Sequence, residues 1–376
     1  MKILHIFSNW KWTGPAEHAL NTAIMLKRAG HDVTFACAAP PANAPESLAA
    51  AAISAGIPPV TPFTLNKHFN LSDNLSDISR LRSFLKKEKF DLIHTHMTND
   101  HLLAGFAAKL IKGKTPIVRT CYDGNGIQST IKNRLLLSTM TDGLITISES
   151  TRRQIMSTYS LPAKKIWKVH VPVDLAKFNP DVVQNCRAQY RLSPDDIVGG
   201  IVARVQKHRR FGVLLEALAI VLREFPQLKF MIIGRGTHIE EIAVKPSMKM
   251  GIRPNLIFTG YKAEDFRETL ACLNFKVFLV PGSDGACRAV REAMAMGIPI
   301  IAARRGMLPE IVENNREGLI IDDKPEYLAD AMMTLVDNPG IRQAMGQNAL
   351  KKAREEFDLE TQAKKIEQIY QEVKRH

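Results

Sequence analysis

The chain has 376 residues, and 45% of them are hydrophobic, so it is long and apolar enough for two or three globular domains with buried cores. Its apolar runs stay short of the roughly 18 residues of a membrane span, and residues 1–7 are too short and strand-like for a signal peptide, which predicts a cytoplasmic protein. The formal net charge is +13, but few aromatic residues lie among the basic clusters, which argues against nucleic acid as a partner.

The basic clusters and the cysteines indicate which partners and which metal or disulfide sites are to be expected. Lysine and arginine gather at 86–89, 152–153, 164–165 and 207–210. Such clusters are attracted to anionic lipid headgroups, at on the order of 1 kcal/mol for each cation, or to a phosphorylated acceptor. A solvated basic surface explains them equally well. The cysteines are odd in number and include no C-x-x-C pair, which predicts neither a disulfide framework nor a zinc site; they are Cys37, Cys121, Cys186, Cys272 and Cys287.

Short apolar strands alternate with helical stretches in two blocks, which is the pattern of parallel doubly wound sheets. The first block has predicted strands at 2–7, 32–38, 91–96, 116–121 and 143–148. The second has them at 197–203, 229–234, 256–261, 275–280, 298–303 and 318–321. Residues 169–181 contain two prolines and are interpreted as the linker, which predicts domains over 1–175 and 190–355. Because ligands bind at the carboxyl ends of parallel strands, two facing sheets would form one interdomain cleft.

The first block carries polar residues at several predicted strand ends. Gly14 follows the first strand and precedes a predicted helix at 16–28, where a glycine lets the backbone approach a ligand, although a single glycine is also common in an ordinary turn. The motif GxGxxG is absent, which counts against a dinucleotide-dependent oxidoreductase. His94 and His96 lie on one face of a strand, so a metal pair is conceivable, but no third ligand follows from the sequence. Arg119 and Asp123 are further candidates for the cleft.

The segment 278–310 is the most informative stretch of the second block. A predicted strand ends at Pro281, and a predicted helix at 286–296 offers the free N–H groups and positive dipole end that bind phosphates. Asp284 lies in the loop before this helix, and Glu292 lies about two turns along it, so both could face one cleft. The alternative is an ordinary strand, turn and helix with a solvated aspartate.

This segment resembles the signature of the retaining nucleotide-sugar glycosyltransferases of the GT-B fold, in the large group 1 family. That signature is Glu, seven residues, Glu, then a helix of small residues and Gly-x-Pro; Asp284 stands here at the first position, which is a departure. The resemblance implies that Asp284 contacts the hydroxyls of the donor sugar and that Glu292 accepts hydrogen bonds from the ribose. It also implies that the backbone of four residues approaches the sugar and the diphosphate, namely Gly285, Ala286, Cys287 and Arg288.

The same resemblance implies roles for residues in other loops. In the segment VARVQKHRRFGVLLEA, Arg204 and Arg209 would hold the donor diphosphate and stabilise the charge of the leaving group, with Lys207 or Arg210 as alternative partners of Arg204. Gly14 would belong to a glycine-rich first loop. Gly234 and Tyr261 would line the nucleotide pocket.

The remaining implications concern the cofactor and the first domain. The resemblance implies no metal ion or other cofactor, because the cations and the helix dipole take over that role. It implies that the C-terminal helix, at about 359–376, packs back on the N-terminal domain, which would bind the acceptor. Tyr122 stands where many family members have a histidine, which indicates a subfamily with its own donor or acceptor.

The sequence thus predicts an α/β protein of the GT-B fold that is a metal-independent, retaining glycosyltransferase. It would move a sugar from a nucleotide-diphosphate donor, for which UDP is the commonest nucleotide of the family, to a saccharide or lipid-linked saccharide acceptor. Lipopolysaccharide, another cell-envelope glycan or a glycolipid is the expected product, made in the cytoplasm or at the inner face of the membrane. The alternatives are a non-catalytic nucleotide-sugar-binding scaffold and a GT-B sugar epimerase or phosphorylase.

Overall fold

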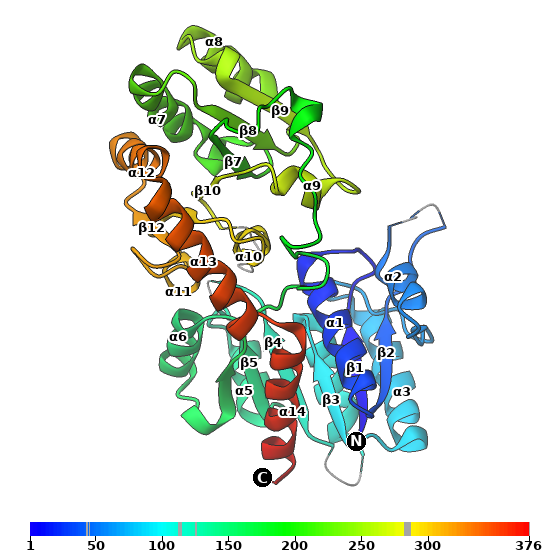
Figure 1. Ribbon diagram of the computed structural model, residues 1–376. Helices are drawn as coiled ribbons and strands as arrows, with labels where there is room; N and C mark the ends of the chain where they lie inside the picture. Colours follow the sequence, from blue (N-terminus) through cyan, green and yellow to red (C-terminus); the bar gives the residue numbers. More distant parts are fainter. Residues whose placement is uncertain (43, 45, 112–114, 125, 282–286, 376) are drawn as a thin grey trace. The chain divides into compact units, whose positions relative to one another are not determined.

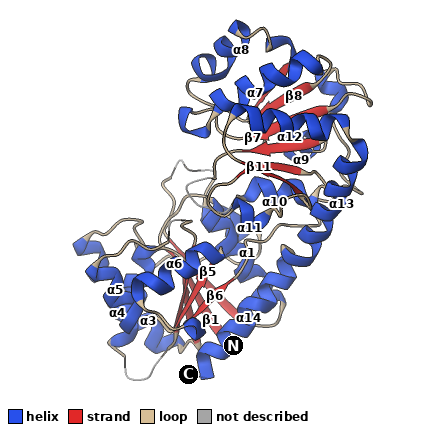
Figure 2. Cartoon of the chain, turned by 90° about the vertical axis from the view of Figure 1, so that its left-hand side faces the viewer, coloured by secondary structure: helices blue, strands red, loops and turns tan. Residues whose placement is uncertain are grey.

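The structure is a computed structural model that describes residues 1–375 apart from 43, 45, 112–114, 125 and 282–286 (Figure 1). The described chain divides into two compact units. The first unit comprises Met1–Pro172 and the C-terminal segment from Leu359, and the second comprises 173–281 and Cys287–Asp358. In each unit the strands lie side by side with helices packed around them (Figure 2). None of the helices described is both long and apolar enough to cross a membrane.

The first unit is built on a parallel six-stranded sheet with the order β2-β1-β3-β4-β5-β6. The strands are β1 (Lys2–Phe7), β2 (Asp32–Cys37), β3 (Leu92–Thr95), β4 (Ile117–Cys121), β5 (Gly143–Thr146) and β6 (Ile166–Lys168). The helices are α1 (Gly14–Arg28), α2 (Leu48–Ser54), α3 (Leu71–Glu88), α4 (Thr98–Lys109), α5 (Ile131–Thr139), α6 (Glu149–Tyr159) and α14 (Leu359–Arg375).

The alternation of side chains along β1 separates two core layers of this unit. Leu4 and Ile6 pack in one hydrophobic cluster with residues of α3 and α4. Ile3 packs on the opposite face, in a cluster with Leu26 of α1 and with four residues of α14, which are Ile366, Ile369, Tyr370 and Val373. The C-terminal helix therefore completes the core of the first unit, although the chain reaches it only after building the second.

The second unit contains another parallel six-stranded sheet, with the order β12-β11-β10-β7-β8-β9. The strands are β7 (Val198–Val202), β8 (Lys229–Ile233), β9 (Leu256–Gly260), β10 (Phe275–Phe278), β11 (Ile300–Ala303) and β12 (Gly318–Ile321). The helices are α7 (Phe211–Glu224), α8 (Lys245–Lys249), α9 (Phe266–Leu270), α10 (Arg288–Ala295), α11 (Leu308–Ile311), α12 (Pro325–Asp337) and α13 (Pro339–Glu356). Helices α7 and α12 share a core with alternate residues of the sheet, such as Phe275 and Val277.

The predicted fold class is confirmed, because both sheets are parallel and each predicted strand is present. Strand β6 was not predicted, since its three residues are too few to show a period of two and stand close to the proline-containing linker. The strand predicted at 275–280 ends at Phe278, and the helix predicted from residue 286 begins at Arg288 with Cys287 as its N-cap.

Candidate functional site

Most residues of the predicted donor site lie at the carboxyl edge of the second sheet. Strand β7 stands between β10 and β8, and the chain runs from β7 outward through β8 and β9 before it returns to β10 on the other side. The point between β7 and β10, where the strand order reverses, is where open α/β sheets bind their ligands. The loops that follow β7 and β10 are therefore where a ligand of this unit is expected to bind.

Arg209 joins these two loops. It ends the short 3₁₀ helix Lys207–Arg209 after β7, and its Nη1 donates hydrogen bonds to the carbonyl oxygens of Val280 (2.9 Å) and Pro281 (3.0 Å) after β10. These bonds fix a half-buried guanidinium at the switch point. Arg204 follows β7 directly and is exposed.

The two alternative cations lie elsewhere. The Nε of Arg210 forms an ion pair with Oδ2 of Asp323 (2.9 Å), in the loop after β12, and Arg305 donates to the same carboxylate. Lys207 is exposed and lines a separate cavity with Thr237 and His238. Of the candidate cations after β7, Arg209 thus contacts the described part of the loop that follows β10.

Gly234 and Tyr261 lie at the next two strand ends. The N–H of Gly234 donates to the carbonyl of Gly260 (2.9 Å), which ties the end of β8 to the end of β9. A Cβ on Gly234 would lie 2.1 Å from the carbonyl oxygen of Ala203, and its φ is +147°, so close backbone packing within the protein already requires glycine here. Tyr261 is 61% exposed, and the Arg235 guanidinium lies 4.8 Å from its ring centroid.

Helix α10 carries the second acid of the predicted motif. Glu292 is buried, and its Oε1 lies 3.3 Å from Nε of Arg288, one turn earlier on the same helix. The N-cap residue Cys287 is buried and has a φ of +46°, a conformation that few residues other than glycine adopt. The other predicted residues of this loop, Asp284, Gly285 and Ala286, lie outside the described residues.

Sequence analysis missed one charged residue beside Glu292. Lys276 lies in the middle of β10 and is fully buried. Alternation places it on the face of the sheet opposite Val277, and its Nζ donates to the carbonyl of Ala289 in the first turn of α10. Burial lowers the pKa of Lys276 to about 7, against the attraction of Glu292 and Cys287. A lone lysine inside the apolar run FKVF was the available signal.

The carboxyl edge of the first sheet has its own switch point, between β1 and β3. Gly14 begins α1 after β1, where the Thr13 side chain accepts from the N–H of Ala16 (3.4 Å) and Pro15 occupies the first turn. A cavity of about 350 Å³ lies at this edge, and it is lined by residues that follow β1 and β3 and by residues at the end of β4 and after it. They include the predicted His96, Arg119, Tyr122 and Asp123, together with Pro15, which follows Gly14 directly.

Three buried imidazoles lie close together in this unit, and one of them, His96, lines the cavity. His5 of β1 is in register with His94 of β3, and the ligand atoms of His5, His94 and His96 lie within 4.8 Å of one another. The structure thus supplies the third imidazole that the sequence did not reveal. Burial lowers the pKa of each of the three imidazoles, which keeps the cluster uncharged.

Hydrogen bonds occupy most of the nitrogen atoms of this cluster. His94 contacts the Tyr370 hydroxyl (2.5 Å) and Thr120 Oγ1 (2.7 Å). His96 contacts His5 Nδ1 (3.0 Å) and the Tyr122 hydroxyl (2.8 Å), so a chain of hydrogen bonds runs from His5 to the cavity. A metal ion would have to displace these bonds, which favours a polar network that fixes the sheet against α14.

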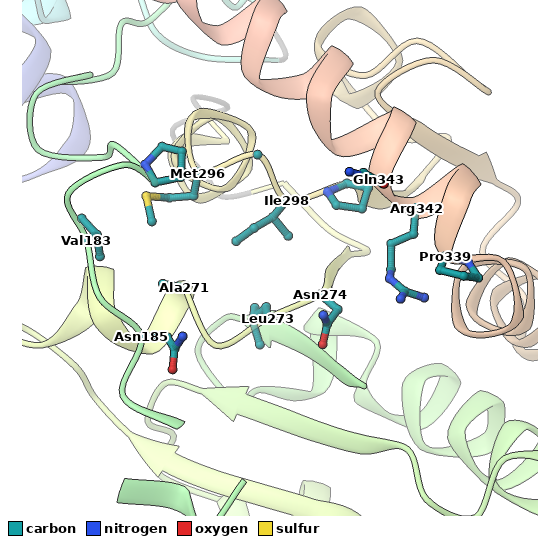
Figure 3. Close-up of a pocket in the computed structure, with 13 residues that line it drawn as sticks. Val183, Asn185, Ala271, Leu273, Asn274, Met296, Ile298, Pro339, Arg342 and Gln343 are labelled. Atoms are coloured by element: carbon teal, nitrogen blue, oxygen red, sulfur yellow. The ribbon is translucent and has the colours of Figure 1, made fainter. Parts of the chain in front are cut away.

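Another cavity, of about 510 Å³, lies at the amino edge of the second sheet, where Asn274 precedes β10 and Pro299 precedes β11 (Figure 3). Two of its polar side chains, Arg342 and Asn274, have partners within the protein. Nη1 of Arg342 donates to the carbonyls of Leu335 and Val336 near the end of α12, and Oδ1 of Asn274 accepts from Arg187 and from the N–H of Val198. This cavity is therefore no part of the predicted site.

Family models match both halves of the chain. Residues 12–177 match the model described as glycosyltransferase family 4, and residues 183–352 match the model described as glycosyl transferases group 1. The two matches together span nearly all of both structural units.

Curated relatives are distant in sequence. A D-inositol 3-phosphate glycosyltransferase of Nocardioides is 27% identical over 62% of this chain and 54% of its own length. A UDP-Gal:alpha-D-GlcNAc-diphosphoundecaprenol alpha-1,3-galactosyltransferase of Escherichia coli is 23% identical over 82% of each chain.

Solved structures match over almost the whole length. A glycosyltransferase from Rickettsia africae has a TM-score of 0.84 and 17% identity, covering 99% of this chain and 98% of its own. HepE from Anabaena, solved in complex with UDP, has a TM-score of 0.80 and 19% identity, covering 98% of this chain and 99% of its own. At these identities the likeness establishes the fold.

Proposed function

Because this chain belongs to the group 1 glycosyltransferases and carries a glycosyltransferase family 4 domain in its first half, we propose that it transfers a sugar from a nucleoside diphosphate to an acceptor hydroxyl with retention of configuration. The observation that carries this proposal is the position of Arg209, whose guanidinium is hydrogen-bonded to the loop after β10 at the switch point of the second sheet.

The donor diphosphate would lie between Arg209, Arg204 and the first turn of α10. As the bond from the sugar to the phosphate breaks, negative charge grows on the leaving phosphate oxygens. A guanidinium that is already in place stabilises this charge without reorganising, and the N–H groups at the start of α10 add to it. The two arginines and this helix start supply the electrostatic role that a divalent ion fills in other transferases. Glu292, two turns further along the helix, would accept hydrogen bonds from the ribose hydroxyls.

The donor is a UDP-sugar in this proposal. In its favour, the structure of HepE with UDP shares the fold over almost the whole chain, and the curated Escherichia coli relative is named for a UDP-galactose donor. The same relative is named for a diphosphoundecaprenol-linked acceptor, which supports a lipid-linked saccharide acceptor and a product of the cell envelope. Binding at the inner face of the membrane would follow from the net charge of +13.

Transfer of labelled sugar tests the proposal. Purified protein is incubated with UDP-glucose, UDP-galactose, UDP-N-acetylglucosamine or GDP-mannose and with envelope lipid extracts. Removal of a preorganised charge lowers turnover by about 10²–10³-fold, so we expect Arg209→Ala to lose turnover with little change in the KM of the donor. Arg223→Ala, which removes an exposed arginine of α7, is the matched control.

Three results would argue against the proposal. Full turnover in Arg209→Ala would remove Arg209 from the site. Donor binding without transfer to any acceptor would favour the non-catalytic scaffold. An inverted anomeric configuration in the product would contradict the retaining mechanism.

A further inference from the structure

A buried arginine of the first unit forms no ion pair with any of the described residues. Arg119, in β4, is 5% exposed and lines the cavity at the carboxyl edge of the sheet. Its Nη1 contacts Nδ1 of His101 (3.2 Å), and its Nη2 donates to Oγ1 of Thr98 (3.2 Å). Its Nε is buried and has no hydrogen-bond partner. The hydrogen-bond partners of this guanidinium among the described residues are therefore two neutral groups.

The carboxylates nearby do not neutralise this charge. Asp100, on α4, accepts hydrogen bonds from the backbone N–H of Ser8 (2.9 Å) and of Met97 (2.9 and 3.0 Å), and it forms no ion pair with Arg119 among the described contacts. Burial raises the pKa of Asp100 to about 7, although the charge of Arg119 opposes this shift, so the carboxyl is only partly charged at neutral pH. Asp123 lines the cavity but is exposed and lies outside ion-pair distance of Arg119. His101 is held neutral, because burial and the charge of Arg119 both lower its pKa.

Two other arginines of this chain, Arg187 and Arg342, donate hydrogen bonds to backbone carbonyl oxygens. Arg187, at the start of the second unit, donates through Nη1 to three carbonyl oxygens, of Ser193, Pro194 and Asp196, at 2.9–3.0 Å. Arg342 donates to carbonyls near the end of α12, where a cation complements the helix dipole. A buried guanidinium without such acceptors or a carboxylate is costly for folding. Arg119 differs from Arg187 and Arg342 because its hydrogen-bond partners among the described residues are side chains with no negative charge, and because its Nε is without a partner.

We propose that Arg119 is an oxyanion subsite for the acceptor, which holds a phosphate or carboxylate group of the acceptor in this cavity. An oxyanion fits because the fork of a guanidinium matches two oxygens of one phosphate or carboxylate. Thr98, which also lines the cavity, begins the 12-residue helix α4, whose positive end adds to the attraction. The volume of about 350 Å³ falls in the range of small-molecule sites.

This inference rests on the proposed function, since it assigns the substrate class to the acceptor side of the same enzyme. It adds that the acceptor carries an anionic group, and that a neutral saccharide of the same size binds worse. The donor residues lie in the second unit, so the two assignments are measured separately.

Calorimetric titration with glycerol 3-phosphate, in saturating UDP, tests the subsite. We expect a dissociation constant of about 1 mM or tighter in the unaltered protein and no binding of glycerol. Arg119→Gln should weaken the binding of glycerol 3-phosphate at least ten-fold. Arg82→Gln, which removes the same charge from an exposed position on α3, should leave it unchanged. Acetate in place of glycerol 3-phosphate shows whether a carboxylate is accepted.

Vesicles that contain phosphatidic acid, used as competitors of glycerol 3-phosphate, distinguish a phosphate on a lipid from a soluble one. Should Arg119→Gln fail to fold, Thr98→Val replaces it, because it removes the hydroxyl that holds Nη2, and a loss of at least three-fold is expected. Equal binding in the unaltered protein and in Arg119→Gln, or no binding of either anion to the unaltered protein, would overturn the proposal. If UDP still binds in those cases, the acceptor subsite is wrong but the assignment of the donor site in the second unit is unaffected.

Discussion

A lysine without access to solvent lies beneath the helix that carries Glu292. Lys276 and Glu292 attract each other within the core of the second unit, and Lys276 also holds the carbonyl of Ala289 in the first turn of α10. The buried amine here positions the start of the helix through its hydrogen bond to this carbonyl. Its cost is desolvation, which is why its pKa falls to about 7.

The lowered pKa of Lys276 predicts how stability depends on pH. Between pH of about 7 and about 10, the unfolded chain binds this proton more strongly than the folded protein does, so the contribution of Lys276 becomes more favourable as the pH rises. Below about pH 7 the lysine is charged in both states and the full penalty applies. We therefore expect the unfolding free energy of the unaltered protein, minus that of Lys276→Met, to increase as the pH is raised from about 7 to about 10. Urea denaturation at several pH values measures this difference. Lys249→Met, at an exposed position of α8, should show a constant difference; a constant difference for Lys276→Met too would refute the assignment.

At the residue scale, the sequence predicted the secondary structure on which a candidate residue lies better than it predicted the contacts of that residue. The motif spacing placed Glu292 on a helix, and the structure buries it there beside Arg288. The approach of Lys276 to Glu292 and of His5 to His94 depends on which strands and helices become neighbours, and spacing along one segment cannot show that. The binding and catalytic roles given to all the predicted site residues, Glu292 and Arg209 among them, stay predictions.

At the scale of elements, the carboxyl ends of β7, β8 and β9 form one tightly packed edge. Gly234 bonds to Gly260 and lies against Ala203, so the three strand ends hold one another in place. The strands themselves were readable because each is a short apolar run bounded by turn residues. Strand β6 could not be predicted in this way, because three residues are too few to show an alternation of side chains. Its place at the edge of the sheet is set by pairing with β5.

A pair of glycine substitutions tests this packing. In Gly234→Ala the added Cβ would lie 2.1 Å from the Ala203 carbonyl at a φ of +147°, so we expect a loss of about 2 kcal/mol or more of unfolding free energy. Gly212→Ala adds the same methyl group in the first turn of α7, with no atom within 4 Å, and should stabilise the protein by about 0.5–1 kcal/mol. Urea denaturation of both variants provides the comparison. Equal stability of the two would show that the strand ends are not packed as described.

At the scale of the whole molecule, donor binding is assigned to the unit with the second parallel sheet, and acceptor binding is assigned to the unit with the first. In the proposal, the second sheet would present arginines and a helix start to the donor diphosphate, and the cavity of the first sheet, with Arg119, would hold an anionic group of the acceptor. The sequence predicted both sheets, and the family indicated by the segment 278–310 is confirmed by the matches over 12–177 and 183–352. The cleft between the domains, the retaining mechanism and the membrane surface stay predictions, because none follows from the contacts within either unit.

The central claim is that Glu292 and the residues around it bind a nucleoside diphosphate. Calorimetric titration of the purified protein with UDP, GDP, ADP and NAD, repeated with Glu292→Gln, tests it most directly. Loss of a hydrogen bond to a charged group costs about 1.5–3 kcal/mol, so we expect one nucleoside diphosphate, UDP, to bind and Glu292→Gln to weaken it at least about ten-fold. Binding of NAD alone, binding of no nucleotide, or UDP binding that the substitution leaves unchanged would contradict the claim.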